Sequence, residues 1–237
     1  MTVDVLAVGA HPDDVEIGIG GLLHKLARQG LRIGILDLTR GEMGTRGTVE
    51  ERLVESTEAA RVLGVVRREN AGLPDAGIHN TPEQQRVVIP FLRSFRPKVL
   101  FNTMAPDRHP DHEAAHYLVR DANFFAGLAR VEGGLPPHRT PRVYHYHPYF
   151  EAALPHLVVD ISDSFETKRE ALRAHASQFF NPDYDGPPTY ISSKSFWDSV
   201  QTRAAYWGSR IGVAYGEALY GTHPLGVDVP PGLEGLV

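Results

Sequence analysis

Two short segments of this chain combine histidine with aspartate in a pattern that could do chemistry. The first reads HPDD and the second reads HPDH, and together they supply His11, Asp13, Asp14, His109, Asp111 and His112. Two imidazoles and one carboxylate, with a position left open for water, are a complete ligand set for a catalytic zinc ion. Imidazole ligands favour zinc, iron, cobalt or nickel over magnesium. The two segments therefore predict a divalent-metal site.

Each segment alone also fits a simpler interpretation. An aspartate ahead of a helix is a common N-cap, which stabilises the helix by about 1 kcal/mol. HPDD or HPDH alone would be explained by a turn followed by such a cap. Both segments directly follow apolar strands that we expect to be neighbours, and that shared context favours the metal site.

The elements that must position these segments follow an alternating order. Strands are expected at 3–9, 31–37, 66–71, 98–103, 142–147 and 156–162, and helices at 17–29, 49–63, 82–95, 112–129, 163–178 and 195–215. Strand–helix–strand units with short connections form right-handed crossovers and parallel sheets. We therefore expect an α/β protein, a three-layer Rossmann-like fold with a mostly parallel sheet. It should form a single domain over 1–237, with an extended C-terminal tail at about 223–237.

Ligands of such folds bind outside the carboxyl ends of the strands. That rule selects three loops, at 10–16, 38–48 and 103–112, and two of them contain the histidine-aspartate segments. The third, TRGEMGTRGT, is polar and rich in glycine. The metal site and its substrate are therefore expected at this edge of the sheet.

Composition limits the classes of partner and the compartment. The net charge is −5 and no basic run is present, which argues against a nucleic-acid partner. No apolar run approaches the ~18 residues of a membrane span, and the N-terminus lacks a signal-peptide pattern. The chain has no cysteine, which excludes disulfides, thiolate nucleophiles and cysteine-based metal sites. A cytoplasmic protein without a membrane partner is expected.

Several longer segments resemble a known family. AHPDDVEIGIGG, TRGEMGT, HPDHEAAH and ASQF are similar to the LmbE-like and PIG-L zinc-dependent N-acetylglucosaminyl deacetylases. TRGEMGTRGT, YISSKSF and GSRIGVAYGE resemble the branch that deacetylates N-acetylglucosaminyl-L-malate in bacillithiol biosynthesis. The resemblance implies one Zn²⁺ per subunit, with Fe²⁺ or Co²⁺ as alternatives, and a small amino-sugar substrate. It also implies a homo-oligomer, either a trimer or a hexamer.

The resemblance assigns roles to the six residues of the two segments. The implied metal ligands are His11, Asp14 and His112. Asp13 becomes the general base, and His109 stabilises the oxyanion or donates a proton. Asp111 would hydrogen-bond to His109 and hold it in place. A carboxylate partner would also raise the pKa of His109, which favours the protonated form that this role requires.

Candidate substrate-binding residues lie in the same loops or in a later one. Arg52 and Arg108 are candidates because arginine binds carboxylates in a bidentate manner, and a malyl group carries two of them. Arg46 and Glu42 belong to the glycine-rich loop, and Tyr190 resembles a family tyrosine that reaches the site. The alternatives are surface arginines, helix-packing salt bridges and, for Tyr190, a packing anchor in a loop.

Rival functions remain open at this point. One is the deacetylation of another GlcNAc conjugate or of a chitin-type oligosaccharide. Another is a catalytically inactive metal-binding or nucleotide-binding protein. Gly18, Gly20 and Gly21 do not form the dinucleotide-binding GxGxxG motif directly after a strand, and are expected to let their helix approach the sheet. Glu16 is interpreted as a capping residue of the first helical turn.

Overall fold

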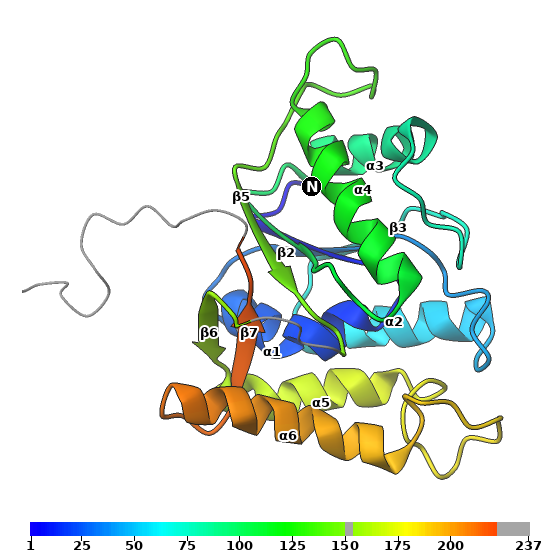
Figure 1. The fold of residues 1–237 in the computed structure, drawn as a ribbon, viewed down its shortest axis with the longest axis vertical. Helices are drawn as coiled ribbons and strands as arrows, with labels where there is room; N and C mark the ends of the chain where they lie inside the picture. Colours follow the sequence, from blue (N-terminus) through cyan, green and yellow to red (C-terminus); the bar gives the residue numbers. More distant parts are fainter. Residues whose placement is uncertain (150–153, 222–237) are drawn as a thin grey trace, which may run out of the picture.

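A five-stranded parallel sheet lies at the centre of the fold (Figure 1). The structure is a computed structural model that describes residues 1–149 and 154–221, so the predicted tail at 223–237 lies outside the described residues. The strand order is β3-β2-β1-β4-β5. The strands are β1 (Val5–Gly9), β2 (Ile33–Asp37), β3 (Arg67–Asn70), β4 (Val99–Thr103) and β5 (Arg142–Tyr146).

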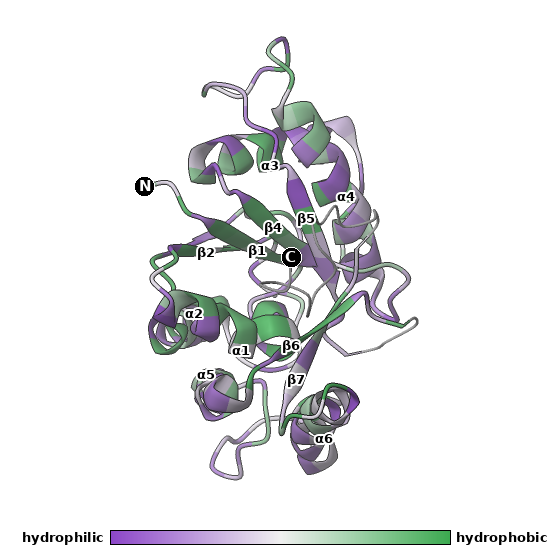
Figure 2. Cartoon of the chain, turned by 90° about the vertical axis from the view of Figure 1, so that its left-hand side faces the viewer, coloured by the Kyte–Doolittle hydropathy of each residue, from purple (hydrophilic) through white to green (hydrophobic). Residues whose placement is uncertain are grey.

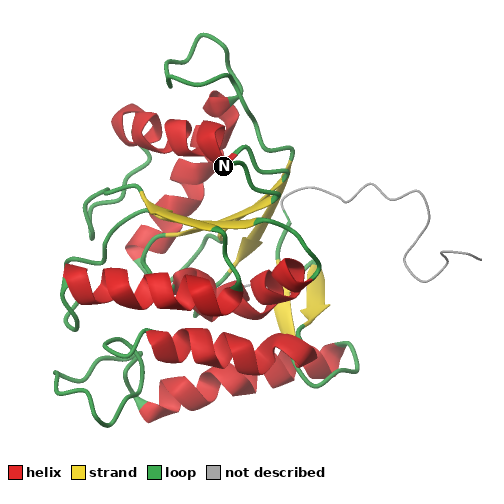
Figure 3. Ribbon diagram, turned by 180° about the vertical axis from the view of Figure 1, so that it is seen from behind, coloured by secondary structure: helices red, strands yellow, loops and turns green. Residues whose placement is uncertain are grey.

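Helices cover both faces of this sheet. The four that do so are α1 (Asp14–Arg28), α2 (Val49–Leu63), α3 (Pro82–Phe95) and α4 (Pro110–Ala126). Helices α3 and α4 lie on one face, and α1 and α2 lie on the other (Figures 1 and 3). This arrangement confirms the predicted three-layer α/β fold. None of the described helices has the length and apolar character needed to cross a membrane.

The C-terminal part of the chain adds an outer layer. Its first strand and its two helices were expected at 156–162, 163–178 and 195–215, but its second strand and its packing as a separate layer were not. It consists of β6 (Leu157–Asp160), the 3₁₀ turn η1 (Ser162–Ser164), α5 (Phe165–Ala174), α6 (Lys194–Arg210) and β7 (Gly216–Leu219). Helices α5 and α6 lie outside α1 and α2 (Figure 3). The expected helix at 195–215 ends at Arg210, and β7 pairs antiparallel with β6. Gly212, which has φ +77°, stands where that helix was expected to continue.

Alternating side chains of the central strands supply two hydrophobic cores. Leu6 and Val8 of β1 pack into the core beneath α3 and α4, whereas Val5 and Ala7 pack into the core beneath α1. Successive side chains of a strand point to opposite faces, so a strand covered on both faces is apolar throughout. Figure 2 shows this continuous hydrophobic colouring on β1 and β4.

The order of the strands creates a reversal at β1. Val5 of β1 pairs with Ile33 of β2 on one side and with Val99 of β4 on the other. The chain thus leaves β1 toward one edge of the sheet and later returns to β4 on the opposite side. The carboxyl ends of two such strands form a topological switch point, where open α/β sheets bind their ligands.

Helix α1 is broken in its middle, and a residue of the outer layer accepts hydrogen bonds from backbone amides next to the break. Ile19 departs from helical geometry, with φ −139° and ψ 20°. The amides of Gly21 and Leu22 donate instead to the carboxylate of Glu217, at 3.0 and 2.6 Å. Lys168 of α5 donates to the same carboxylate at 2.6 Å. A helix end needs partners for its amides, and here a buried ion pair provides them.

Close packing against α1 predicts a stability difference between two glycines. A Cβ atom at Gly18 would clash with the ring of buried Tyr146, whereas a Cβ atom at Gly20 would meet Lys168 at an ordinary 3.5 Å. We expect Gly18→Ala to lower the free energy of unfolding by about 1–3 kcal/mol through overpacking. Gly20→Ala should match the wild type or exceed it slightly. Denaturant unfolding tests the pair, and equal stability of the two variants would refute the packing explanation.

Candidate metal centre and active site

The switch point between β1 and β4 brings the HPDD and HPDH segments together. Asp14 is the first residue of α1 and His112 lies in the first turn of α4, and both are fully buried. Oδ1 of Asp14 lies 3.1 Å from Nε2 of His112. Neither atom makes a hydrogen bond within the part of the chain that the structure describes. Buried polar atoms are normally paired, so this pair indicates a ligand that both atoms face.

The donor atoms fit a divalent cation. Nδ1 of His11 lies 3.5 Å from Oδ2 of Asp14. Ligand atoms bound to a tetrahedral zinc ion at 2.0–2.1 Å are separated from one another by about 3.3 Å. Zinc, ferrous and cobalt ions accept mixed imidazole and carboxylate ligands. His11, Asp14 and His112 thus bring together the donor types that such an ion takes, with each histidine facing a different oxygen of Asp14.

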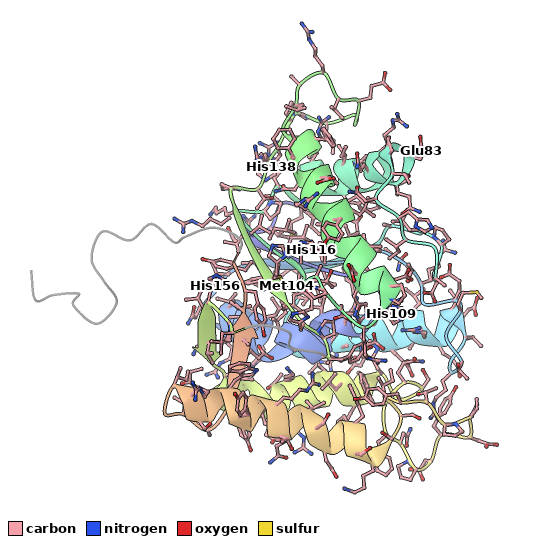
Figure 4. All side chains as sticks on the ribbon, in the orientation of Figure 1. Glu83, Met104, His109, His116, His138 and His156 are labelled. Carbon is pink, nitrogen blue, oxygen red and sulfur yellow. The ribbon has the colours of Figure 1, made fainter. Side chains whose placement is uncertain are left out.

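His109 is a geometric rival for the third ligand position. One ligand atom from each of His11, His109 and His112 lies within 4.8 Å of the others. The ring centroid of His109 is 4.7 Å from that of His11 and 4.6 Å from that of His112. The buried, unpaired oxygen of Asp14 favours Asp14 over His109. Figure 4 shows His109 at the start of α4.

Two aspartates that the sequence analysis gave no role orient the histidines. Nε2 of His11 lies 3.0 Å from Oδ1 of Asp75, and Nδ1 of His112 lies 3.2 Å from Oδ1 of Asp107. Metal-binding histidines usually donate their second N–H to a carboxylate, which fixes the tautomer. Asp107 was visible beside HPDH, whereas Asp75 lies in the loop GLPDAG, which carries no motif.

These carboxylates also set the charge of the site. Burial would lower the pKa of His112, but Asp14 and Asp107 outweigh it and raise that pKa to about 9. Burial likewise opposes protonation of His11, yet the Asp111, Asp14 and Asp75 carboxylates raise its pKa well above the ordinary value. The surroundings thus favour positive charge between the two rings. A metal ion competes with protons for such ligands.

Asp13 is buried and directly precedes the candidate ligand Asp14. Burial raises the pKa of its carboxyl to about 6, although the nearby Arg52 guanidinium opposes the rise. Nη2 of Arg52 lies 3.5 Å from Oδ2 of Asp13. A carboxylate with a pKa close to neutrality is suited to accept and release a proton.

The structure corrects the expected relation between His109 and Asp111. The Asp111 carboxylate accepts the amides of Ala76 and Ile78 and lies 3.4 Å from Nε2 of His11. His109 is held by the Asp111 amide, which donates to Nδ1 at 3.2 Å. Burial and the neighbouring His112 and His11 lower the pKa of His109. A neutral His109 with its proton on Nε2 can still donate a hydrogen bond, so the expected protonated form is not required.

A cavity of about 250 Å³ opens over these residues. Its walls include His11, Asp13, Arg52, Asp75, His109 and Tyr149. This volume is slightly below the ~300–1,000 Å³ of typical ligand pockets. A ligand that extends beyond the metal centre therefore has to contact the rim of the cavity.

The rim carries an arginine between two tyrosines. The guanidinium of Arg108 lies 4.7 Å from the ring centroid of Tyr149 and 4.7 Å from that of Tyr190. Tyr149 stacks on His112 and lines the cavity, whereas Tyr190 is 63% exposed. The structure thus places Arg108, a predicted substrate-binding residue, against Tyr149 of the cavity wall, and Tyr190, another one, against Arg108. Tyr149 was not predicted.

The other polar residues discussed from the sequence have structural partners. Arg52 donates to the carbonyls of Gly41 and Pro12 while its guanidinium stays in the cavity wall. Glu42 accepts the amides of Asp75 and Arg40 and joins two loops.

Glu16 differs from its interpretation as a capping residue. Its carboxylate is completely buried, pairs closely with Arg68 and lies 3.2 Å from Nε2 of His175. Arg68 also pairs with Asp37 at the end of β2. In sequence, an acidic residue in the first turn of a helix can be either a capping residue or a partner in a buried ion pair. The partners of Glu16 come from distant elements, so only the fold reveals them.

The ligand sets completed by Asp14 and by His109 predict different outcomes of histidine substitution. If Asp14 completes the site, His112→Ala should abolish tight binding of one Zn²⁺, whereas His109→Ala should retain one equivalent. Removal of a ligand leaves the ion without the coordination number that it needs. Metal content after dialysis, with circular dichroism as a control for folding, measures both variants. Loss of metal in His109→Ala together with retention in Asp14→Ala would establish the rival set.

Comparison with known proteins identifies relatives of this chain. The family model PIG-L, GlcNAc-PI de-N-acetylase, matches residues 6–123, which include both segments. Diacetylchitobiose deacetylase of Thermococcus kodakarensis is 32% identical over 91% of this chain and 81% of its own length. A probable N-acetyl-alpha-D-glucosaminyl L-malate deacetylase 2 of Bacillus anthracis is 28% identical over 74% of this chain and 81% of its own length.

A solved structure extends the likeness to the whole fold. A conserved protein of Thermus thermophilus superimposes with a TM-score of 0.86 at 38% identity, covering 97% of this chain and 98% of that one. The matched segments include those that converge at the switch point. The chain belongs to the PIG-L family of de-N-acetylases.

Proposed function

We propose that this protein is a divalent-metal-dependent hydrolase, with zinc as the favoured ion, that removes the N-acetyl group from an N-acetylglucosamine conjugate. The observation that carries this proposal is the buried pair of unbonded ligand atoms on Asp14 and His112, with Asp13 beside it. Family membership supports deacetylation as the reaction. N-acetylglucosaminyl-L-malate is the favoured substrate, which would place the protein in bacillithiol biosynthesis.

The chain's own residues can divide the work of amide hydrolysis. A divalent ion held by His11, Asp14 and His112 would supply Lewis-acid polarisation of the acetyl carbonyl and lower the pKa of water. Asp13 takes a proton from the attacking water and delivers it to the leaving amine. His109 donates a hydrogen bond from Nε2 to the developing oxyanion, a contribution that is typically worth about 10²–10³ in rate. The products are acetate and the free amino sugar.

The rim supports an anionic group as the second half of the substrate. Arg108 is exposed, and its planar guanidinium is suited to bind a carboxylate in a bidentate manner. Tyr149 and Tyr190 flank it and restrict its orientation. A malyl group attached to the sugar would bring two carboxylates to this position. Arg52 can assist from the cavity wall.

A chitin-type disaccharide is the second candidate substrate. The Thermococcus relative is named as a diacetylchitobiose deacetylase, and its match covers more of this chain than that of the malate-type relative. Tyrosine rings also provide flat apolar surfaces on which a second sugar ring can lie. This alternative uses the same metal centre and changes only the group bound at the rim.

Acetate release separates these candidates. We expect release from GlcNAc-malate to exceed release from N-acetylglucosamine and from N,N'-diacetylchitobiose, and to stop after chelation and resume with Zn²⁺. The expected reason is the carboxylate contact of Arg108, so Arg108→Ala should remove most of the preference while retaining release from N-acetylglucosamine. A preference for the disaccharide would replace the malate assignment. Release from no acetylamino sugar by the metal-loaded protein would contradict the deacetylase proposal and favour an inactive metal-binding protein.

The general-base role of Asp13 makes a separate prediction. Asp13→Asn should retain one metal equivalent but lower kcat by about 10²–10⁴, because the water has lost its proton acceptor. Steady-state kinetics and metal analysis on the same sample measure both quantities. An active Asp13→Asn variant with normal metal content would remove Asp13 from the mechanism. Loss of the metal would instead make Asp13 a ligand.

A further inference from the structure

Arg46 is buried and bonded to a distant segment of the chain. Its Nε donates to the carbonyl of Ser177 at 2.5 Å, and its Nη1 donates to the carbonyls of Pro187 and Gly186 at 3.0 and 3.3 Å. The side chain thus reaches three carbonyls of one loop, residues 177–191, which we call the C-terminal loop. Only arginine presents several N–H groups in a rigid plane that can make such a set of contacts.

The contacts are reciprocal. The amide side chain of Gln178 donates to the Arg46 carbonyl at 2.7 Å, and the Gly47 amide donates to the hydroxyl of Tyr184 at 3.2 Å. The Tyr184 ring also lies 4.6 Å from the Arg46 guanidinium. Gly47 has φ +73°, and a Cβ atom there would lie 2.6 Å from Oγ of Ser177. The two loops are therefore in close backbone contact, which glycine at position 47 permits.

Both loops that Arg46 joins form walls of the same cavity. Met43 and Gly44 line it from the loop at 38–48, and Gln178 and Ile191 line it from the C-terminal loop. The C-terminal loop also carries Tyr190, the outer ring beside Arg108 at the rim. Arg46 itself is not among the residues that line the cavity.

We propose that Arg46 is a positioning residue for substrate selection, which acts by fastening the C-terminal loop and thereby holding Tyr190 against Arg108. This inference rests on the proposed function of the same site. Arg46 acts through the loop and does not touch the substrate. Its removal should therefore impair recognition of the group beyond the acetamido sugar and leave the metal centre intact.

Kinetics with a short and a long substrate test the proposal. In Arg46→Met we expect KM for GlcNAc-malate, the long substrate, to rise about tenfold. The reason is that a displacement of a positioning group by about 1 Å has a large effect on catalytic efficiency. The kcat for N-acetylglucosamine should change less than about twofold, with unchanged metal content. Arg46→Lys keeps the charge but not the planar set of donors, and should resemble Arg46→Met. Arg61→Met is the matched control, because Arg61 is exposed on α2 and pairs only with nearby Glu58 among the described residues.

Hydrogen exchange provides a readout that needs no substrate. Peptides covering the C-terminal loop should exchange faster in Arg46→Met than in wild type or Arg61→Met, and added guanidinium at low concentration should partly restore both protection and KM. Equal losses on both substrates, or unchanged exchange and KM, would overturn the proposal. Wild-type protein without any deacetylase activity would contradict the proposed function, and exchange would then decide the role of Arg46 in holding the loop.

Discussion

The parallel pairing of β1 with β4 is the constraint on which the site depends. Each strand ends at the same edge of the sheet, so the first residues of α1 and α4 must face each other there. Asp14 and His112 consequently lie 3.1 Å apart although 98 positions separate them in sequence. Both are fully buried, and each lies in the first turn of a helix. Rigid elements hold a catalytic geometry more accurately than loops do.

Several carboxylates lie close to this pair. Burying so many negative charges is unfavourable unless positive charge lies nearby. The carboxylates of Asp13, Asp14, Asp75, Asp107 and Asp111 all lie in the same region, and a bound cation would offset part of their desolvation cost. A second buried ionic group lies farther along α1, where Arg68 neutralises Glu16 and Asp37. The fold thus surrounds one end of α1 with two charged groups, one that Arg68 balances and one that a bound cation would balance.

The sequence predicted the helices well where residues at the ends of the helix itself determine its boundaries. The helices at 49–63 and 82–95 were predicted with their observed limits, because Thr48 and Thr81 cap them at the start. The parallel sheet and the adjacency of β1 and β4 were also confirmed. The α5–α6 layer and β7 were less accessible, because their positions depend on packing against α1 and α2.

The residues of the candidate site were also predictable only in part. His11, Asp14 and His112 could be selected as ligands because each lies in a short motif that follows a strand, and their role stays a prediction. Asp75 lies alone in a loop, and only the fold brings it to His11. The orientation of the Asp111 carboxylate toward His11 depends on amides of that same loop, so spacing within HPDH could not reveal it. The trimeric or hexameric assembly also stays a prediction.

The break in α1 ties the two halves of the chain together. The candidate metal ligands lie in the first half, whereas Lys168 and Glu217 of the second half bond to the interrupted helix that begins at Asp14. The second half also supplies Tyr190 to the rim. A first half without the second would leave the Gly21 and Leu22 amides without their carboxylate partner, in the helix whose first residue is the candidate ligand Asp14. The second half therefore supports the candidate site, although the candidate metal ligands all lie in the first half.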